Sequence, residues 1–279
     1  MKYKIVVDSC CDLKPEEKAD PHFQIVSLTL SILGKDIIDD ETFDQAAYLA
    51  MVASSKEPPH TACPSPEAYR AAYEEGGAEC VYVVTLSQHL SGSYNSAVVG
   101  AQMLLEEKPD VKIHVFSSDS ACVGESLIAL KIRELCEAGL SFEEVVEQAG
   151  EFRDKMNTFF VLESLDALKK NGRLTGLAAL VVTALNIKPV MAGNHGIIEK
   201  LGQARGIQKA LEKMISIAQT RVTSPETKTL GITHCNCPER ALWVRDKILE
   251  KIPFRNVYLV DAAGVASTYA SDGGIVVCF

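Results

Sequence analysis

Residues 79–86 read Glu79-Cys80-Val81-Tyr82-Val83-Val84-Thr85-Leu86, and the loop that follows includes Leu90-Ser91-Gly92-Ser93-Tyr94. The first stretch is a short apolar run, which is typical of a buried strand. Ala97, Ala101 and Leu104 then recur at helical spacing. A strand, a loop of small residues and a helix form one unit of a parallel sheet with helical crossovers. The loop also sets hydroxyl groups beside the unpaired N–H groups of a helix start, where an anion is favoured.

The same alternation of strand and helix runs through the first half of the chain. We predict strands over 4–7, 25–30 and 113–117, and helices over 42–54, 66–75, 93–106, 121–138 and 141–155. This order favours an α/β domain with a parallel sheet. Ligands bind such sheets beyond the carboxyl ends of the strands, where this chain carries Asp8-Ser9, Ser87 and Ser118-Asp119-Ser120.

The second half has a different pattern. Gly193-Asn194-His195-Gly196 lies between the apolar stretches 188–192 and 197–201, which predicts a β-hairpin. We predict further strands over 158–162, 227–233, 256–260 and 274–279, and helices over 165–170 and 177–185. We therefore expect an N-terminal α/β domain over residues 1–156 and an α+β domain with antiparallel pairing over 157–279. A ligand site is expected between them.

Composition excludes several classes of function. The chain of 279 residues has 28 basic and 37 acidic side chains, and a net charge of −9 argues against binding nucleic acid. No run approaches the roughly 20 apolar residues of a membrane span, so we expect a cytoplasmic protein. Nine scattered cysteines fit reduced thiols. His234-Cys235-Asn236-Cys237 has no second pair at zinc spacing, so we predict a turn before a helix at Pro238 and no metal.

A second hydroxyl loop reads Thr61-Ala62-Cys63-Pro64-Ser65-Pro66. Ser65 suits the N-cap of a helix and Pro66 its first position. Neither hydroxyl loop contains a His, Asp or Lys that would activate a nucleophile, which favours holding an anion over attacking a substrate. Two enzyme alternatives stay open: a hydrolase with Ser91 or Ser93 as nucleophile, and a phosphotransferase acting on a small polyol.

Seven motifs occur in a defined order: Asp8-Ser9, Thr61 to Pro66, Leu90 to Ala97, Asp119-Ser120, Lys170 to Leu174, Leu185 to Pro189 and Ala204-Arg205-Gly206. In this order and spacing the chain resembles the DegV family, whose members bind long-chain fatty acids. Some members are the fatty-acid-binding subunit of a bacterial fatty acid kinase. The resemblance implies a lipid-binding protein without catalysis or cofactor, a ligand such as palmitate, stearate or oleate, and a kinase as partner. A regulatory module that senses lipid and binds a protein partner stays open as an alternative, as does transient contact with a membrane.

The resemblance also implies roles for single residues. Thr61, Ser91 and Ser93 would donate hydrogen bonds to the carboxylate, and Gly92 would let the backbone approach it. Arg173 would lie near the head group, and Arg205 on the surface used by the kinase. Tyr269 replaces a histidine of the family, while Ala62, Cys63 and Asp272 are further departures. We expect the acyl chain to be lined by Ile25, Leu28, Leu30, Phe159, Val161, Leu177, Leu180, Val181 and Leu185.

Overall fold

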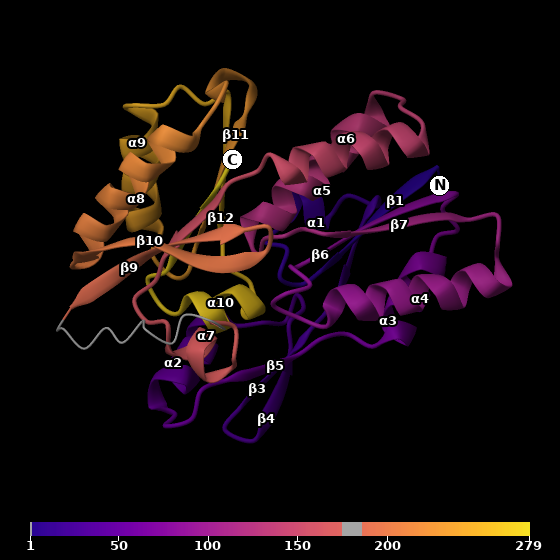
Figure 1. The fold of residues 1–279 in the computed structure, drawn as a ribbon. Helices are drawn as coiled ribbons and strands as arrows, with labels where there is room; N and C mark the ends of the chain where they lie inside the picture. Colours follow the sequence, from indigo (N-terminus) through magenta and orange to yellow (C-terminus); the bar gives the residue numbers. More distant parts are fainter. Residues whose placement is uncertain (1, 175–185) are drawn as a thin grey trace.

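The computed structural model describes residues 2–174 and 186–279. Its first sheet, sheet A, contains only parallel pairs in the order β2-β1-β6-β7. These strands are β1 (Tyr3–Asp8), β2 (Phe23–Val26), β6 (Cys80–Thr85) and β7 (Lys112–Ser117). Helices α3 (Pro66–Glu74) and α4 (Ser93–Glu107) cover one face, and α5 (Val123–Glu137) and α6 (Phe142–Asp154) cover the other (Figure 1). The parallel α/β architecture expected for the first half is confirmed.

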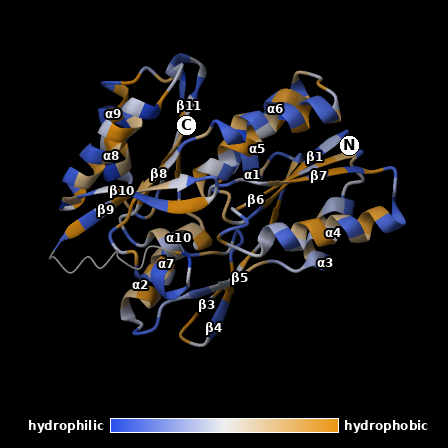
Figure 2. Ribbon diagram, viewed as in Figure 1, coloured by the Kyte–Doolittle hydropathy of each residue, from blue (hydrophilic) through white to orange (hydrophobic). Residues whose placement is uncertain are grey.

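The second sheet, sheet C, is mixed and has the order β10-β9-β8-β13-β11-β12 in the described residues. Its strands are β8 (Thr158–Val161), β9 (Ile187–Asn194), β10 (Ile197–Arg205), β11 (Thr229–His234), β12 (Asn256–Asp261) and β13 (Ile275–Cys278). The predicted hairpin is β9–β10, and among the described strands of this sheet only β11 and β12 pair in parallel. Helices α8 (Ile207–Arg221) and α9 (Pro238–Leu249) pack on one face through apolar stripes, visible as alternating colours in Figure 2.

A third, antiparallel sheet, sheet B, was not predicted. It contains β3 (Thr29–Ile32), β4 (Lys35–Ile38) and β5 (His60–Ala62) and packs beside α2 (Gln45–Ser54) and α10 (Gly264–Ala270). The predicted single strand over 25–30 is wrong, because the chain leaves sheet A after Val26 and enters sheet B at Thr29. An apolar run does not reveal such a change of sheet. The short elements α1 (Pro15–Lys18), α7 (Asp166–Lys170) and η1 (Pro225–Thr227) complete the described fold.

The two halves of the chain are joined at several points. Lys14 N, just before α1, donates to the hydroxyl of Tyr258 in β12 at 2.9 Å. Asp39, next to β4, accepts hydrogen bonds from the backbone N–H groups of Gly264 and Val265 at 2.7 and 2.9 Å. Helix α10 is thereby attached to the N-terminal half. The domain boundary at 156/157 stays a prediction, and the predicted helix 177–185 lies outside the described residues.

None of the helices in the described residues is long and apolar enough to cross a bilayer.

Candidate functional site

A cavity lies between the carboxyl end of sheet A and the face of sheet C that is turned away from α8 and α9. Loops after β1, β6 and β7 form one wall, and β8, β9, β10, β13 and α10 contribute the other side. The expected position of the site, between the two halves and beyond the strand ends, is confirmed. Most of the wall is apolar and comes from Leu28, Leu86, Leu90, Phe160, Leu162, Leu168, Ile198, Val265 and Val276.

Four polar side chains gather on one part of this wall. Thr61, Ser91, Arg173 and Tyr269 all line the cavity and are half-buried. The hydroxyl groups of Thr61 and Tyr269 lie 2.9 Å apart. The guanidinium carbon of Arg173 lies 5.7 Å from the centre of the Tyr269 ring, and Arg173 Nε donates to the carbonyl of Leu90 at 3.1 Å. Hydroxyl donors and one cation around an apolar space suit a ligand with an anionic head and an apolar body.

A second group of polar residues lies where β7 ends. Asp119, Ser120 and Thr158 line the cavity, and the hydroxyls of Ser120 and Thr158 are 2.8 Å apart. Ser87, at the end of β6, donates to the carbonyl of Gly196 at 3.1 Å. Gly196 has a φ of +78°, and a side chain there would collide with the Ser87 hydroxyl. This contact therefore fixes the turn of the β9–β10 hairpin against the loops of sheet A.

Ser93 is not placed as the resemblance implied. Its side chain is fully buried, and its hydroxyl donates to Asp8 Oδ2 at 2.6 Å and lies 2.5 Å from the hydroxyl of Tyr69. It does not line the cavity, and neither does Gly92. A side chain at Gly92 would approach Cys63 Sγ to 3.2 Å, so Gly92 allows the two hydroxyl loops to pack together. The hydroxyl of Ser93 is directed to Asp8, and its role at the head group stays a prediction.

The expected apolar lining needs a similar correction. Leu28 lines the cavity, but Ile25, Leu30, Phe159 and Val161 lie in the surrounding hydrophobic clusters and do not. Successive side chains of a strand point to opposite faces, so Phe159 and Val161 face α8 and α9 while Phe160 and Leu162 face the cavity. The alternation of side chains along residues 158–162 was the sequence signal that could have separated the cavity-facing residues from the others. Leu177, Leu180, Val181 and Leu185 lie outside the described residues.

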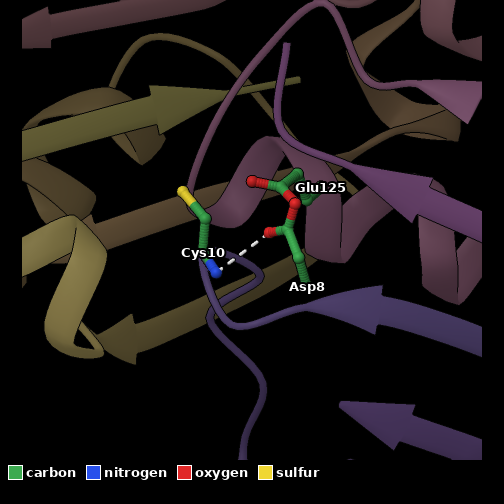
Figure 3. A group of neighbouring side chains, drawn as sticks. All are labelled: Asp8, Cys10 and Glu125. Carbon is green, nitrogen blue, oxygen red and sulfur yellow. Dashed lines mark hydrogen bonds between the residues drawn. The ribbon is translucent and has the colours of Figure 1, made fainter. Parts of the chain in front are cut away.

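A buried cluster of Asp8, Cys10 and Glu125 lies beside the cavity (Figure 3). One ligand-type atom from each residue lies within 4.8 Å of the other two. Asp8 already accepts hydrogen bonds from Cys10 N at 3.1 Å, Leu86 N at 3.0 Å and Ser93 Oγ. Because both oxygens of Asp8 are engaged, we assign no metal to the cluster. The segment His234–Cys237 forms the predicted turn before α9, and His234 Nδ1 pairs with Asp261 Oδ1 at 3.2 Å.

The nucleophile alternatives find little support in this geometry. Ser91 Oγ accepts a hydrogen bond from Ser93 N at 3.2 Å, and in the described part of the chain no His, Lys or carboxylate is bonded to it. Ser93 does contact a carboxylate but is closed off from the cavity. An activated nucleophile needs a base within hydrogen-bond reach and access to the substrate.

Comparison with known proteins identifies the family. The DegV family model matches residues 2–279. The chain belongs to the DegV family. A DegV domain-containing protein of Streptococcus pyogenes serotype M1 is 37% identical over 279 residues, covering 99% of this chain and 98% of the relative.

Solved structures of other DegV proteins share the fold. A crystal structure of a DegV protein from Ruminococcus gnavus, refined with vaccenic acid, is 46% identical and superposes with a TM-score of 0.96 over 99% of both chains. The Fatty Acid Kinase (Fak) B3 protein of Streptococcus pneumoniae, loaded with linoleic acid, is 33% identical, with a TM-score of 0.87 over 100% of this chain and 99% of that one. Both similarities extend over the whole cavity region of this DegV protein.

Proposed function

We propose that this DegV protein binds one long-chain fatty acid, such as palmitate, stearate or oleate, in the cavity between sheets A and C. The observation that supports this most is an apolar cavity with hydroxyl and guanidinium groups on one part of its wall. A relative of 46% identity with the same fold was crystallised with vaccenic acid. The acyl chain occupies the apolar part, and the protein carries out no chemistry on it.

The carboxylate lies beside Thr61, Ser91, Arg173 and Tyr269. A hydroxyl that donates to a charged oxygen contributes about 1.5 to 3 kcal/mol. Burial of about 15 methylene groups at roughly 0.8 kcal/mol each gives on the order of 12 kcal/mol of gross driving force. Ordering of the ligand and association offset much of that. The acyl chain therefore supplies most of the affinity, and the polar residues set the orientation.

The bound acid is then presented to a fatty acid kinase. The similarity to the Fak B3 protein of Streptococcus pneumoniae supports this second step. Arg205 at the end of β10 is exposed and does not line the cavity, which fits a residue for partner contact. A regulatory module that senses lipid would use the same cavity, so identification of the partner separates the two roles.

Native mass spectrometry of the purified protein, followed by extraction and identification of the lipid, tests the proposal. We expect one fatty acid of about 16 to 18 carbons per chain. After removal of the lipid, the protein should bind palmitate or oleate in a fluorescence displacement assay. Failure to bind either acid at micromolar concentration would refute the proposed function.

A further inference from the structure

Asp8 and Glu125 form a pair of carboxyl groups that the proposed function does not use. Asp8 ends β1 and Glu125 lies in the first turn of α5, and neither side chain is exposed. Figure 3 shows the two carboxyl groups facing each other beside Cys10. Neither makes a salt bridge with any residue that the structure describes. Two ionised carboxylates this close, without a cation, repel each other strongly, so such a pair retains a proton.

The hydrogen bonds indicate which carboxyl group carries the proton. Asp8 accepts three hydrogen bonds, from Cys10 N, Leu86 N and Ser93 Oγ, and these stabilise its charged form. Both oxygens of Glu125 are buried and have no donor within the described residues. The negative charge of an ionised Glu125 would therefore have no hydrogen-bond donor to stabilise it. A neutral Glu125 has an O–H that donates to Asp8. Burial raises the pKa of both groups, that of Glu125 well above its ordinary value.

Asp8 joins this pair to the polar part of the cavity. Its Oδ2 accepts from Leu86 N and from Ser93 Oγ, which stand at the two ends of the loop between β6 and α4. Ser93 N in turn donates to Ser91 Oγ at 3.2 Å, and Ser91 lines the cavity. The charge and position of the buried Asp8 carboxylate therefore determine, through Ser93, where the Ser91 hydroxyl lies.

We propose that Asp8 and Glu125 share one proton, with Glu125 as the neutral donor, and that the pair positions the Ser91 loop at the polar end of the cavity. The inference rests on the proposed function, since it assigns two positioning residues to the same cavity. Loss of the shared proton places two negative charges in a buried site. The loop then shifts, and the fatty acid loses the Ser91 contact.

The other titratable groups that face the pair are neutral at physiological pH. They are Cys10 and Cys11 after β1, Cys122 at the start of α5, and Tyr69 of α3. The hydrogen bond with Cys122, then burial, raises the pKa of Cys10, and burial raises those of Cys11 and Tyr69. The hydrogen bond with Cys10 lowers the pKa of Cys122, but burial and the nearby acidic groups together outweigh it and raise the value to about 11.

Infrared spectroscopy of the ligand-free protein tests the shared proton directly. At about pH 8, above the pKa of about 7 of Asp12, which is another buried carboxyl group, the wild type should keep a protonated carboxyl band from Glu125. Glu125→Gln should lack this band. The matched control Glu134→Gln changes an exposed glutamate of the same helix and should keep it. Absence of the band in the wild type overturns the proposal. This measurement needs only the wild type, so it decides even if Glu125→Gln does not fold. One equivalent of Zn²⁺ bound by the wild type but not by Glu125→Gln also overturns it, in favour of a cation.

The pH profile of palmitate binding tests the positioning role. Affinity of the wild type and of Glu134→Gln should fall by up to about tenfold per pH unit over the pH range in which the protonated carboxyl band disappears. The amide of Glu125→Gln still donates to Asp8, so its affinity should stay flat over this range. Equal profiles for the wild type and Glu125→Gln overturn the positioning role and leave the proposed function intact. A wild type that binds no palmitate at any pH refutes the proposed function, while the infrared band still reports on the shared proton.

Discussion

The hydroxyl groups of Thr61 and Tyr269 lie 2.9 Å apart although 208 positions separate them in the chain. Thr61 belongs to β5 of sheet B, and Tyr269 belongs to α10, which follows the last parallel strand of sheet C. Both line the cavity, and Arg173 lies over the ring of Tyr269. The contact therefore joins the two halves of the molecule at the place where we propose that the carboxylate binds.

Replacement of Tyr269 by histidine should make fatty-acid binding depend on pH. A histidine at this position is charged below neutral pH and attracts a carboxylate, whereas it is neutral at about pH 9. We expect Tyr269→His to bind palmitate more tightly than the wild type at about pH 6 and with similar affinity at about pH 9. Fluorescence displacement at both pH values provides the measurement. A change in affinity that is the same at both would show that residue 269 does not contact the carboxylate.

Removal of the Ser93 hydroxyl should reduce the stability of the folded protein. Ser93→Ala leaves the buried Asp8 with two backbone donors and deprives Tyr69 of its partner. An incompletely satisfied buried group costs about 1 to 3 kcal/mol, and urea denaturation should report a loss of that size. Ser96→Ala, in the same helix and with a hydroxyl that only approaches Cys63 Sγ at 3.8 Å, is the control. Equal stability of Ser93→Ala and the wild type would contradict the structural role assigned to Ser93.

Local sequence signals predicted much of the fold. The N-cap at Ser65 with Pro66 after it, the turn at residues 193–196 and the strands β1, β6 and β7 of sheet A depend on neighbouring residues, and the structure has them. Sheet B was missed because its strands are short and pair across distant segments. Thr61 pairs with Leu30, for example, which no local pattern encodes.

The candidate site was predicted less completely, for a related reason. The resemblance grouped Ser91 with Ser93, yet the structure turns only Ser91 to the cavity, because Asp8 and Tyr69 take the hydroxyl of Ser93. Asp8 and Tyr69 lie 85 and 24 positions away from Ser93 in the chain. A loop sequence tells which side chains can donate, but distant acceptors decide where each of them points.

Asp12 should make the stability of the protein depend on pH. It is buried, accepts hydrogen bonds from Ala263 N at 2.8 Å and Thr233 Oγ1 at 2.9 Å, and burial raises its pKa from 3.8 to about 7. Between these values the native state holds a proton that the unfolded state has released, so rising pH favours unfolding. This contribution to stability is full below about pH 3.8 and is lost as pH rises through about 7.

Urea denaturation of the wild type and Asp12→Asn from about pH 4 to about pH 8 tests this dependence. The variant has no carboxyl group at this position, so its stability should decline less over the range. Asp110→Asn, at an exposed position, should behave like the wild type. A decline that is as steep in Asp12→Asn as in the wild type would assign the effect to other carboxyl groups.

The double variant Thr61→Ala with Ser91→Ala separates binding of a carboxylate from general lipid binding. Each hydroxyl lines the cavity, and loss of both donors to a charged acceptor should lower the affinity for palmitate by about two orders of magnitude, unless water replaces them. Hexadecanol has the same alkyl chain and a neutral head, so its affinity should change little. The pair Ser216→Ala and Thr220→Ala removes two exposed hydroxyls from α8 and serves as the control. Calorimetry with both ligands provides the comparison. If these hydroxyls recognise the carboxylate, only the acid loses affinity; equal losses for acid and alcohol would place the head group elsewhere in the cavity.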